Sequence, residues 1–219
     1  MKLFSALYNG LMNFENNFCC IPYIAKLGVG VQFPAKTSII RRENELFVIS
    51  PGPLEAEAEL LNEYKLNFIS PNNFHHFHLK AMQQRFPEAK FYGGMRAKKQ
   101  CGVDLQPLKN LEGLDFLKIE GNDLLGERVF YHPESKHLIT TDIVFNMHHK
   151  MNPATRIATT MAGTYHKLAT SRLVLMTMDD RGAYRSSLQA LLNWDFETVV
   201  VNHGDNISKE EFKSFLYEE

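Results

Sequence analysis

Three short apolar runs in this sequence each lead into side chains that commonly bind metal ions. The runs cover residues 66–69, 138–141 and 199–201, and the polar residues that follow them are His75 and His76, Asp142, and His203. Short apolar runs of this kind predict buried strands, so each polar residue should lie at a strand end. Strand ends that meet at one edge of a sheet would bring these side chains together. The sequence therefore predicts a sheet-based fold with one site at a sheet edge.

Length and charge limit the class of protein. The chain has 219 residues, 44% of them hydrophobic and 22% charged, which is enough for one large α/β domain over residues 1–219. Lys and Arg number 24 and Asp and Glu 25, so the net charge of -1 supplies no excess positive field. No apolar run approaches the roughly 20 residues that cross a bilayer. We therefore expect neither nucleic acid nor a membrane as a partner.

Cysteine usage points to a reducing environment. The chain has three cysteines, Cys19, Cys20 and Cys101. An odd number with two neighbours argues against a disulfide framework. Cys19 and Cys20 are better interpreted as small buried residues of a strand. We predict a cytoplasmic protein.

The order of the expected elements favours sheets covered by helices. Residues 36–41 and 45–49 predict two strands around a polar turn. Further strands are expected over 66–69, 89–92, 116–119, 128–132, 137–140 and 198–201, and helices over 54–64, 77–85, 153–168, 181–192 and from Ser208, where Glu211 completes a capping box. Strands come first, β and α then alternate, and helices finally return to one strand. This order predicts sheets with helices on their outer faces.

The side chains at the strand ends suit a metal site. Histidine and carboxylate ligate zinc, iron and manganese, and a site built from separate segments needs rigid strand ends. His75 and His76 fall near the first turn of the helix expected from residue 77, where the helix dipole favours the neutral, metal-binding ring. Each residue also has an ordinary interpretation, because nine histidines are scattered along the chain and an Asp after a strand often caps a turn. The combination of three strand ends indicates the site.

Several short motifs follow one another along the chain, at residues 47–52, 70–76, 85–90, 137–142, 194–196 and 201–205. Their order resembles the metallo-β-lactamase fold superfamily and, more narrowly, its DUF4336 family of uncharacterised proteins. Their order and spacing are more specific than any one of them, and the likeness spans about residues 30–205. The resemblance implies an α/β or α+β chain folded as a four-layer αββα sandwich, with the site at one edge between the two sheets.

The metal ligands that the resemblance implies are incomplete. The superfamily motif Thr-His-x-His-x-Asp-His falls on residues 70–76, and its first two histidines fall on Pro71 and Asn73. A third histidine of that metal site should lie near Asn122, where none is present. The resemblance therefore implies that the first metal site is lost. For the second site it implies His75 in place of an aspartate, together with His76, Asp142 and His203.

The resemblance and the residues together predict a metal-dependent hydrolase with a reduced site. One divalent ion, Zn or Fe with Mn as a further possibility, would provide a hydroxide that attacks an ester, thioester, amide or phosphate bond of a small molecule. Four protein ligands would close a tetrahedral site, whereas catalysis needs an open position. The ion must then have five or six ligands, or one residue is free; His75, which departs from the family pattern, would in that case act as a general base.

Two other functions remain open from the sequence. The loss of one metal site fits a catalytically silent member of the fold that binds a small molecule or a protein. Histidine and carboxylate ligation also fits a mononuclear iron redox protein. The sequence does not determine the oligomeric state.

Overall fold

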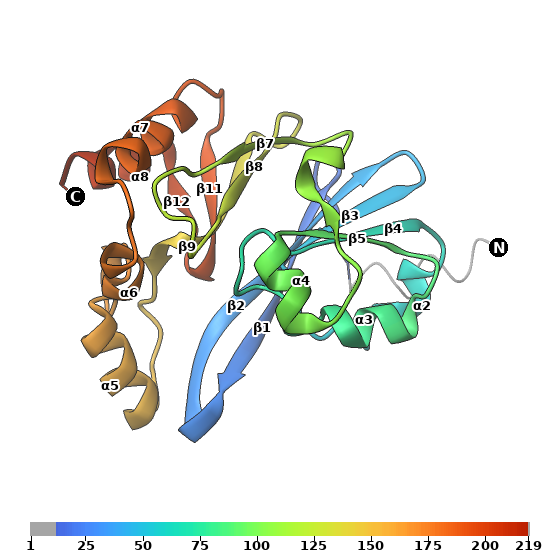
Figure 1. Cartoon of the computed structure of the whole chain (residues 1–219), viewed down its shortest axis with the longest axis horizontal. Coiled ribbons are helices and arrows are strands. Elements are labelled where there is room, and N and C mark those ends of the chain that lie inside the picture. Colours follow the sequence, from blue (N-terminus) through green and yellow to red (C-terminus); the bar gives the residue numbers. More distant parts are fainter. Residues whose placement is uncertain (1–11, 219) are drawn as a thin grey trace.

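The structure, a computed structural model, describes residues 12–218, whose strands form two sheets of six (Figure 1). The first sheet has its strands in sequence order: β1 (Phe18–Leu27), β2 (Val31–Arg42), β3 (Glu45–Ile49), β4 (Lys65–Ile69), β5 (Lys90–Gly93) and β6 (Gln106–Pro107). The strands β1 to β3 are antiparallel, and β3 to β6 run parallel. Because β3 and β4 are parallel, the segments that follow them leave the sheet at the same edge.

The second sheet has the order β12-β11-β9-β8-β7, and β10 also pairs with β9. Its strands are β7 (Asp115–Lys118), β8 (Arg128–His132), β9 (His137–Asn146), β10 (Leu168–Ala169), β11 (Thr198–Gly204) and β12 (Ile207–Ser208). The central strands β9 and β11 are parallel, and the other pairs are antiparallel. The ends of β9 and β11 therefore also lie at one edge of the sheet.

Helices cover the outer face of each sheet. They are α2 (Ala58–Leu61), α3 (Leu79–Arg85) and α4 (Met95–Cys101) on the first sheet, and α6 (Arg172–Met176), α7 (Arg181–Leu191) and α8 (Lys209–Glu218) on the second. A further helix, α5 (Pro153–Ala162), packs against β2 and against the short 3-10 turn η1 (Gly28–Gly30), and a second such turn, η2 (Leu108–Asn110), follows β6. None of the described helices is long and apolar enough to span a bilayer.

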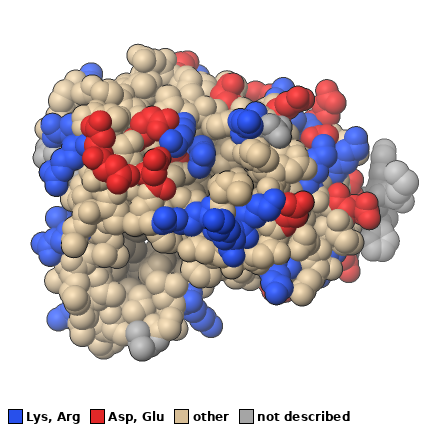
Figure 2. Space-filling model, viewed as in Figure 1, with Lys and Arg blue, Asp and Glu red and all other residues tan. Residues whose placement is uncertain are grey.

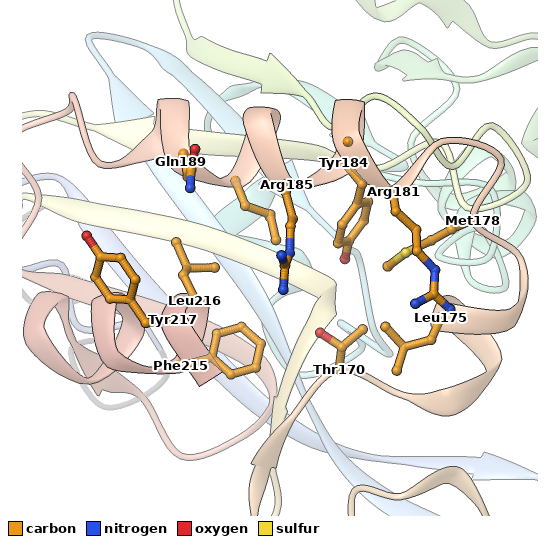
Figure 3. Close-up of a pocket in the computed structure, with 12 residues that line it drawn as sticks. Thr170, Leu175, Met178, Arg181, Tyr184, Arg185, Gln189, Phe215, Leu216 and Tyr217 are labelled. Atoms are coloured by element: carbon orange, nitrogen blue, oxygen red, sulfur yellow. The ribbon is translucent and has the colours of Figure 1, made fainter. Parts of the chain in front are cut away.

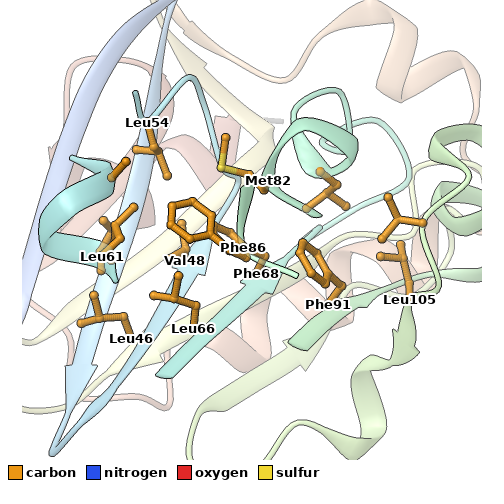
Figure 4. Close-up of a cluster of buried hydrophobic side chains, with 14 of the residues drawn as sticks. Leu46, Val48, Leu54, Leu61, Leu66, Phe68, Met82, Phe86, Phe91 and Leu105 are labelled. Carbon is orange, nitrogen blue, oxygen red and sulfur yellow. The ribbon is translucent and has the colours of Figure 1, made fainter. Parts of the chain in front are cut away.

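Buried apolar side chains form three layers between these elements. One layer packs α2, α3 and α4 against the first sheet (Figure 4), and a second packs α6, α7 and α8 against the second sheet. The third lies between the sheets and includes Ile40, Ile49, Ile69, Phe130, Ile139 and Val200. Three apolar layers require four layers of structure. The predicted αββα sandwich is confirmed.

The strands that carry the predicted site are longer than the sequence pattern suggests. Strand β9 continues to Asn146 and β11 to Gly204, so Asp142 and His203 lie within strands rather than beyond them. Two predicted helices are shorter: residues 54–64 form only α2, and α5 ends at Ala162. Gly163 ends α5 because it adopts the left-handed conformation typical of a residue that terminates a helix.

Local predictions elsewhere are met. Ser208 and Glu211 form the capping box, since the backbone N–H of each residue donates to the side chain of the other. The cysteines Cys19, Cys20 and Cys101 are all free thiols. Cys19 and Cys20 lie in β1, as expected for small residues of a strand.

Lys36 links the two sheets by hydrogen bonds at the edge that carries the site. Its ammonium group, on β2, donates to the carbonyls of Val201 and Gly204 and to the side chain of Asn206. Burial lowers the pKa of this lysine, so the charged form depends on these acceptors.

We expect Lys36→Met to lower the free energy of unfolding by about 2 kcal/mol, because it leaves two carbonyls without their charged donor. Chemical denaturation measures the change. Lys26→Met is the matched control, because Lys26 is an exposed lysine of the same hairpin and should change stability by less than about 0.5 kcal/mol. Equal effects of the two substitutions would contradict the linking role of Lys36.

Candidate metal centre

An irregularity in the pairing of β9 with β11 positions two of the predicted ligands. Val201 pairs with Thr140, but His203 pairs with Phe145, so residues 141–144 of β9 lie opposite Asn202 alone. Such bulges bend a strand and redirect its side chains. Asp142 lies within this stretch and His203 directly follows it, and the bulge therefore brings their side chains to the same point.

The bulge also leaves two backbone N–H groups of β9 without a partner on the neighbouring strand, and a buried carboxylate accepts hydrogen bonds from both. The Glu127 carboxylate accepts from the N–H of Thr141 at 2.7 Å and from the N–H of Asp142 at 2.8 Å. Buried N–H groups are costly unless they are hydrogen-bonded. Glu127 is fully buried, and it holds the backbone of Asp142 in the bulged conformation.

His75 reaches the same point from the loop after β4. Asn72 orders this loop, because its side-chain oxygen accepts from the N–H of Phe74 at 2.8 Å and of His75 at 3.0 Å. The amide group of the same Asn72 side chain donates to the Asp142 carboxylate at 2.7 Å. Asn72 thus joins the loop to β9.

The three side chains form a compact group of possible ligands. The Nε2 atom of His75 lies 3.2 Å from one carboxylate oxygen of Asp142, and the Nε2 atom of His203 lies 3.4 Å from the other. The two Nε2 atoms are 3.4 Å apart. Ligands about 2.0–2.1 Å from a tetrahedral ion lie roughly 3.3 Å from one another. The three side chains therefore form a group small enough for one ion: with one ligand atom taken from each residue, all three atoms lie within 4.8 Å of one another.

Hydrogen bonds to the far ring nitrogens fix how both imidazoles are presented. Nδ1 of His203 lies 3.0 Å from the carbonyl of Pro34, so it carries the proton and leaves Nε2 as the electron-pair donor. Nδ1 of His75 lies 2.6 Å from the hydroxyl of Ser50, which also accepts from the Asn202 amide at 3.1 Å. Outer partners of this kind orient metal-binding histidines and select their tautomer.

In the absence of an ion, His75 and Asp142 shift each other's pKa. Burial lowers the pKa of His75, but the Asp142 carboxylate outweighs this effect and the net pKa is raised. Burial raises the pKa of Asp142, but His75 and His203 hold it well below its usual range. His75 and Asp142 therefore form an ion pair that a metal ion would replace. Because the ion must displace a proton from His75, its affinity should fall in acid.

Glu127 should impose a pH dependence on the stability of the metal-free protein. Burial, followed by the charge of Asp142, raises the pKa of Glu127 to about 7. Because the pKa of Glu127 is higher in the folded protein than its value of about 4.5 in the unfolded chain, the protonated carboxyl favours the folded state. This contribution is complete below pH 4.5 and is lost as the pH rises towards 7. Glu127→Gln should remove this slope, which is on the order of 2–3 kcal/mol.

Denaturant titrations across that pH range test the slope. Glu88→Gln provides the control, because Glu88 is an exposed carboxylate. The control should keep the slope of the unsubstituted protein. An unchanged slope in Glu127→Gln would show that Glu127 is ionised throughout.

His76, the fourth predicted ligand, lies apart from the other three. Its Nε2 atom lies 2.9 Å from the side-chain oxygen of Gln100 on α4, and the group of possible ligands contains only His75, Asp142 and His203 among the described residues. The turn before α3 directs the His76 ring towards α4 rather than towards the second sheet. His75 therefore lies within the group of possible ligands, and His76 lies outside it.

The positions at which the resemblance implies a lost first metal site have structural roles. The carbonyl of Pro71 accepts from the N–H of Arg128. The Asn73 amide donates to the carbonyls of Asp123 and Leu124 at 3.2 and 3.1 Å. These bonds tie the loop after β4 to the segment before β8, where Asn122 also bonds to backbone and to a side chain. The side-chain amides of Asn73 and Asn122 therefore bond to protein groups, and Pro71 has no side-chain atom that could bind a metal.

Aromatic rings from two strands pack on His203, and a third aromatic residue lies near Ser50 and Asp142. Phe145 on β9 stacks on the imidazole with 5.3 Å between centroids, and Phe33 on β2 meets it edge-on at 5.0 Å. Tyr23 on β1 lies close enough to Ser50 and Asp142 for both to affect its pKa, which burial raises. The phenol therefore stays protonated and can donate a hydrogen bond. The β1–β2 hairpin thus forms one wall of the centre.

Sequence reasoning missed the residues that support the ligands. Ser50, Asn72 and Glu127 are buried polar residues that contact His75, Asp142 or the backbone around them. The sequence could have indicated Ser50 and Asn72 as site residues, because both lie in the short polar segments that follow the apolar runs of β3 and β4. Glu127 carried none, since its role depends on the bulge in β9.

A separate cavity of about 480 Å³ lies between α6, α7 and α8 (Figure 3). It is lined by Arg181 and Arg185 on α7 and by apolar side chains that include Leu175 and Phe215. None of the predicted ligands lines it. The metal centre and this cavity are therefore different features of the molecule.

Comparison with solved structures places this geometry in a known fold. The metallo-β-lactamase FIM-1 of Pseudomonas aeruginosa, in its mono-zinc form, matches with a TM-score of 0.65 at 8% identity over 94% of each chain. The chain has the metallo-β-lactamase fold. The metallo-β-lactamase of Pontibacter korlensis matches with a TM-score of 0.64 at 12% identity over 95% of this chain and 98% of its own. That of Hirschia baltica gives 0.60 at 11% identity over 94% of each chain.

Sequence comparison gives no closer relationship. No family model matches the chain, and no curated protein matches it. The metallo-β-lactamase fold is thus established by structure alone, and the narrower resemblance to the DUF4336 family gains no support from the family models.

Proposed function

We propose that the protein is a metal-dependent hydrolase that works with a single divalent ion held by His75, Asp142 and His203. The observation that carries this proposal is the compact group of two imidazole Nε2 atoms and the Asp142 carboxylate, whose neighbouring atoms are 3.2, 3.4 and 3.4 Å apart. One ligand atom from each residue can be chosen so that all three lie within 4.8 Å of one another, which suits a single shared ion. The donor set of two imidazoles and one carboxylate suits Zn, Fe or Mn. Three ligands leave the open position that catalytic sites keep.

The ion would supply Lewis acidity, lowering the pKa of water and polarising a carbonyl or phosphoryl oxygen. The protein's own residues have three supporting tasks. Ser50 and the carbonyl of Pro34 hold the two imidazoles with their Nε2 atoms turned inward. Glu127 and Asn72 hold Asp142 in place. Phe33 and Phe145 exclude water from one side of His203.

The substrate would be a small molecule with an ester, thioester, amide or phosphate bond. The protonated phenol of Tyr23, on the hairpin wall, would be the hydrogen-bond donor that orients a carbonyl or phosphoryl oxygen. We further propose a cytoplasmic location, which three free thiols support. A relationship to the DUF4336 family, supported by the order of the sequence motifs, also belongs to this proposal.

A substrate panel tests the hydrolase assignment. Protein reconstituted separately with Zn, Fe(II) and Mn would be assayed against chromogenic carboxylic esters, thioesters, anilides and phosphodiesters. We expect turnover of one class that disappears with a chelator, returns with the metal, and is absent in His203→Ala. Folded, metal-loaded protein that turns over none of these classes would contradict hydrolysis.

A further inference from the structure

The tip of the β1–β2 hairpin joins α5 and α6 in one projecting part of the molecule, which we call the hairpin lobe. Its parts are residues 24–32 and residues 150–176, which include α5 and α6. The Thr155 hydroxyl of α5 donates to the carbonyl of Gln32 and accepts from its N–H, both at 2.8 Å, and Asn152 donates to the carbonyl of Gly30. Arg172 of α6 donates to the carbonyl of Met161. Figure 1 shows the tip and α5 extending away from the sheets.

The hairpin lobe exposes an unusual share of the large apolar side chains. Ten such side chains are exposed in the described part of the chain, and six of them belong to this lobe. They are Ile24, Leu27, Ile157, Met161, Leu173 and Met176, with exposed fractions of 53%, 46%, 62%, 71%, 68% and 82%. In each helix the two residues lie three or four positions apart and so share a face. Concentrations of this kind mark surfaces that bind something apolar.

The charges of the hairpin lobe all have one sign. Residues 16–42 and 143–178 contain no Asp or Glu, and they contribute five exposed basic side chains to the lobe. These are Lys26, Lys150, Arg156, Lys167 and Arg172, none of which has an ion-pair partner among residues 12–218. Figure 2 shows this part of the surface, at lower left, as tan with blue and no red. Asp205 lies near its base, beside Lys36 and His149.

We propose that the hairpin lobe docks the protein on an anionic lipid surface. Exposed Met, Leu and Ile side chains enter the boundary between headgroups and acyl chains, while the surrounding Lys and Arg side chains contact anionic headgroups. The two features favour a lipid surface, because an apolar partner alone would not require five unpaired cations. The net charge of -1 does not oppose docking, since acidic groups elsewhere are screened beyond a Debye length of about 10 Å.

Docking would place the metal centre next to the lipid surface. The same hairpin that ends in the lobe carries Tyr23 and Phe33, which line the centre. Neither vesicle binding nor its measurement needs the ion. The docking proposal can therefore fail or succeed separately from the proposed hydrolase function.

Vesicle flotation with the full chain tests the proposal. Vesicles of phosphatidylcholine with about one-third phosphatidylglycerol would be compared with pure phosphatidylcholine, at low and high salt. We expect binding to the anionic vesicles only, and weaker binding at high salt. Met161→Asp with Met176→Asp, or Lys26→Glu with Arg156→Glu, should each weaken it by about tenfold or more. Asp142→Asn should bind like the unsubstituted protein, because docking does not use the metal centre.

Matched controls lie outside the hairpin lobe. Met95→Asp changes an apolar side chain of α4 that is 67% exposed, and Lys213→Glu changes an exposed cation of α8. Both should bind vesicles like the unsubstituted protein. No binding to anionic vesicles, or equal losses in the lobe and control variants, would overturn the proposal. A dimer that the Met161→Asp and Met176→Asp pair dissociates, without vesicle binding, would overturn it in favour of self-association.

Discussion

Asp142→Asn is expected to weaken metal binding by at least about 100-fold. This is more than the loss in affinity expected when only a hydrogen-bond partner of a metal ligand is removed. The substitution keeps the shape of the side chain and the backbone N–H that donates to Glu127, so the bulge in β9 should persist. It removes the one negative charge among the three ligands and the ion pair with His75. Competition with a chromophoric chelator measures the affinity.

His76→Ala is the informative control for this result. The sequence motif predicts His76 as a ligand, whereas its ring lies on Gln100. We expect His76→Ala to bind the ion as tightly as the unsubstituted protein. If His76→Ala loses the ion together with Asp142→Asn, the loop after β4 must rearrange on metal binding and the three-ligand site is wrong. Circular dichroism of each variant verifies that the fold is intact.

Gly204→Ala is expected to destabilise the protein by on the order of 4 kcal/mol and to lower its melting temperature by about 10 °C. Gly204 has φ of +121°, a conformation that side chains rarely adopt. A Cβ atom there would lie 2.0 Å from the carbonyl oxygen of Asn146 and 2.9 Å from the N–H nitrogen of Met147. Both are backbone atoms at the end of β9 rather than flexible side-chain atoms, and the strain falls next to His203.

Gly102→Ala separates the steric clash from the cost of the backbone conformation. Gly102 follows α4 with φ of +69°, and a Cβ atom there meets nothing within 4 Å. Its substitution should cost only about 1 kcal/mol, from the left-handed conformation itself. Thermal denaturation of the two variants gives the comparison. Similar losses for both would mean that β9 and β11 are not as close as the structure places them.

The sequence could predict the layers of the fold because apolar periodicity reflects burial. The strands and helices that the sequence predicts lie near observed ones, but it predicts no strand for most of β1 or for β6, β10 and β12, and no helix for α4 or α6. It could not predict that β9 continues to Asn146, because the charged Asp142 interrupts the apolar pattern. The backbone N–H groups of Thr141 and Asp142 donate to Glu127, whose position is known only when β8 and β9 are paired.

The sequence likewise predicts the features of the site that depend on neighbouring residues, but not those that depend on contacts between distant segments. His75, Asp142 and His203 were identifiable because each follows or ends an apolar run. His76 shares that local position, yet its direction depends on α4, which supplies Gln100 from 24 residues away. The absence of a membrane partner was expected from the net charge, but an average over the whole chain hides a local basic surface such as the hairpin lobe.

Native mass spectrometry of the protein after exposure to excess zinc tests the single-ion centre most directly. Intact-mass differences count the ions bound to each folded chain. We predict one ion per chain, and none in Asp142→Asn. Two ions per chain would contradict the structural roles assigned to Pro71, Asn73 and Asn122, and no ion in the folded protein would contradict the metal centre itself.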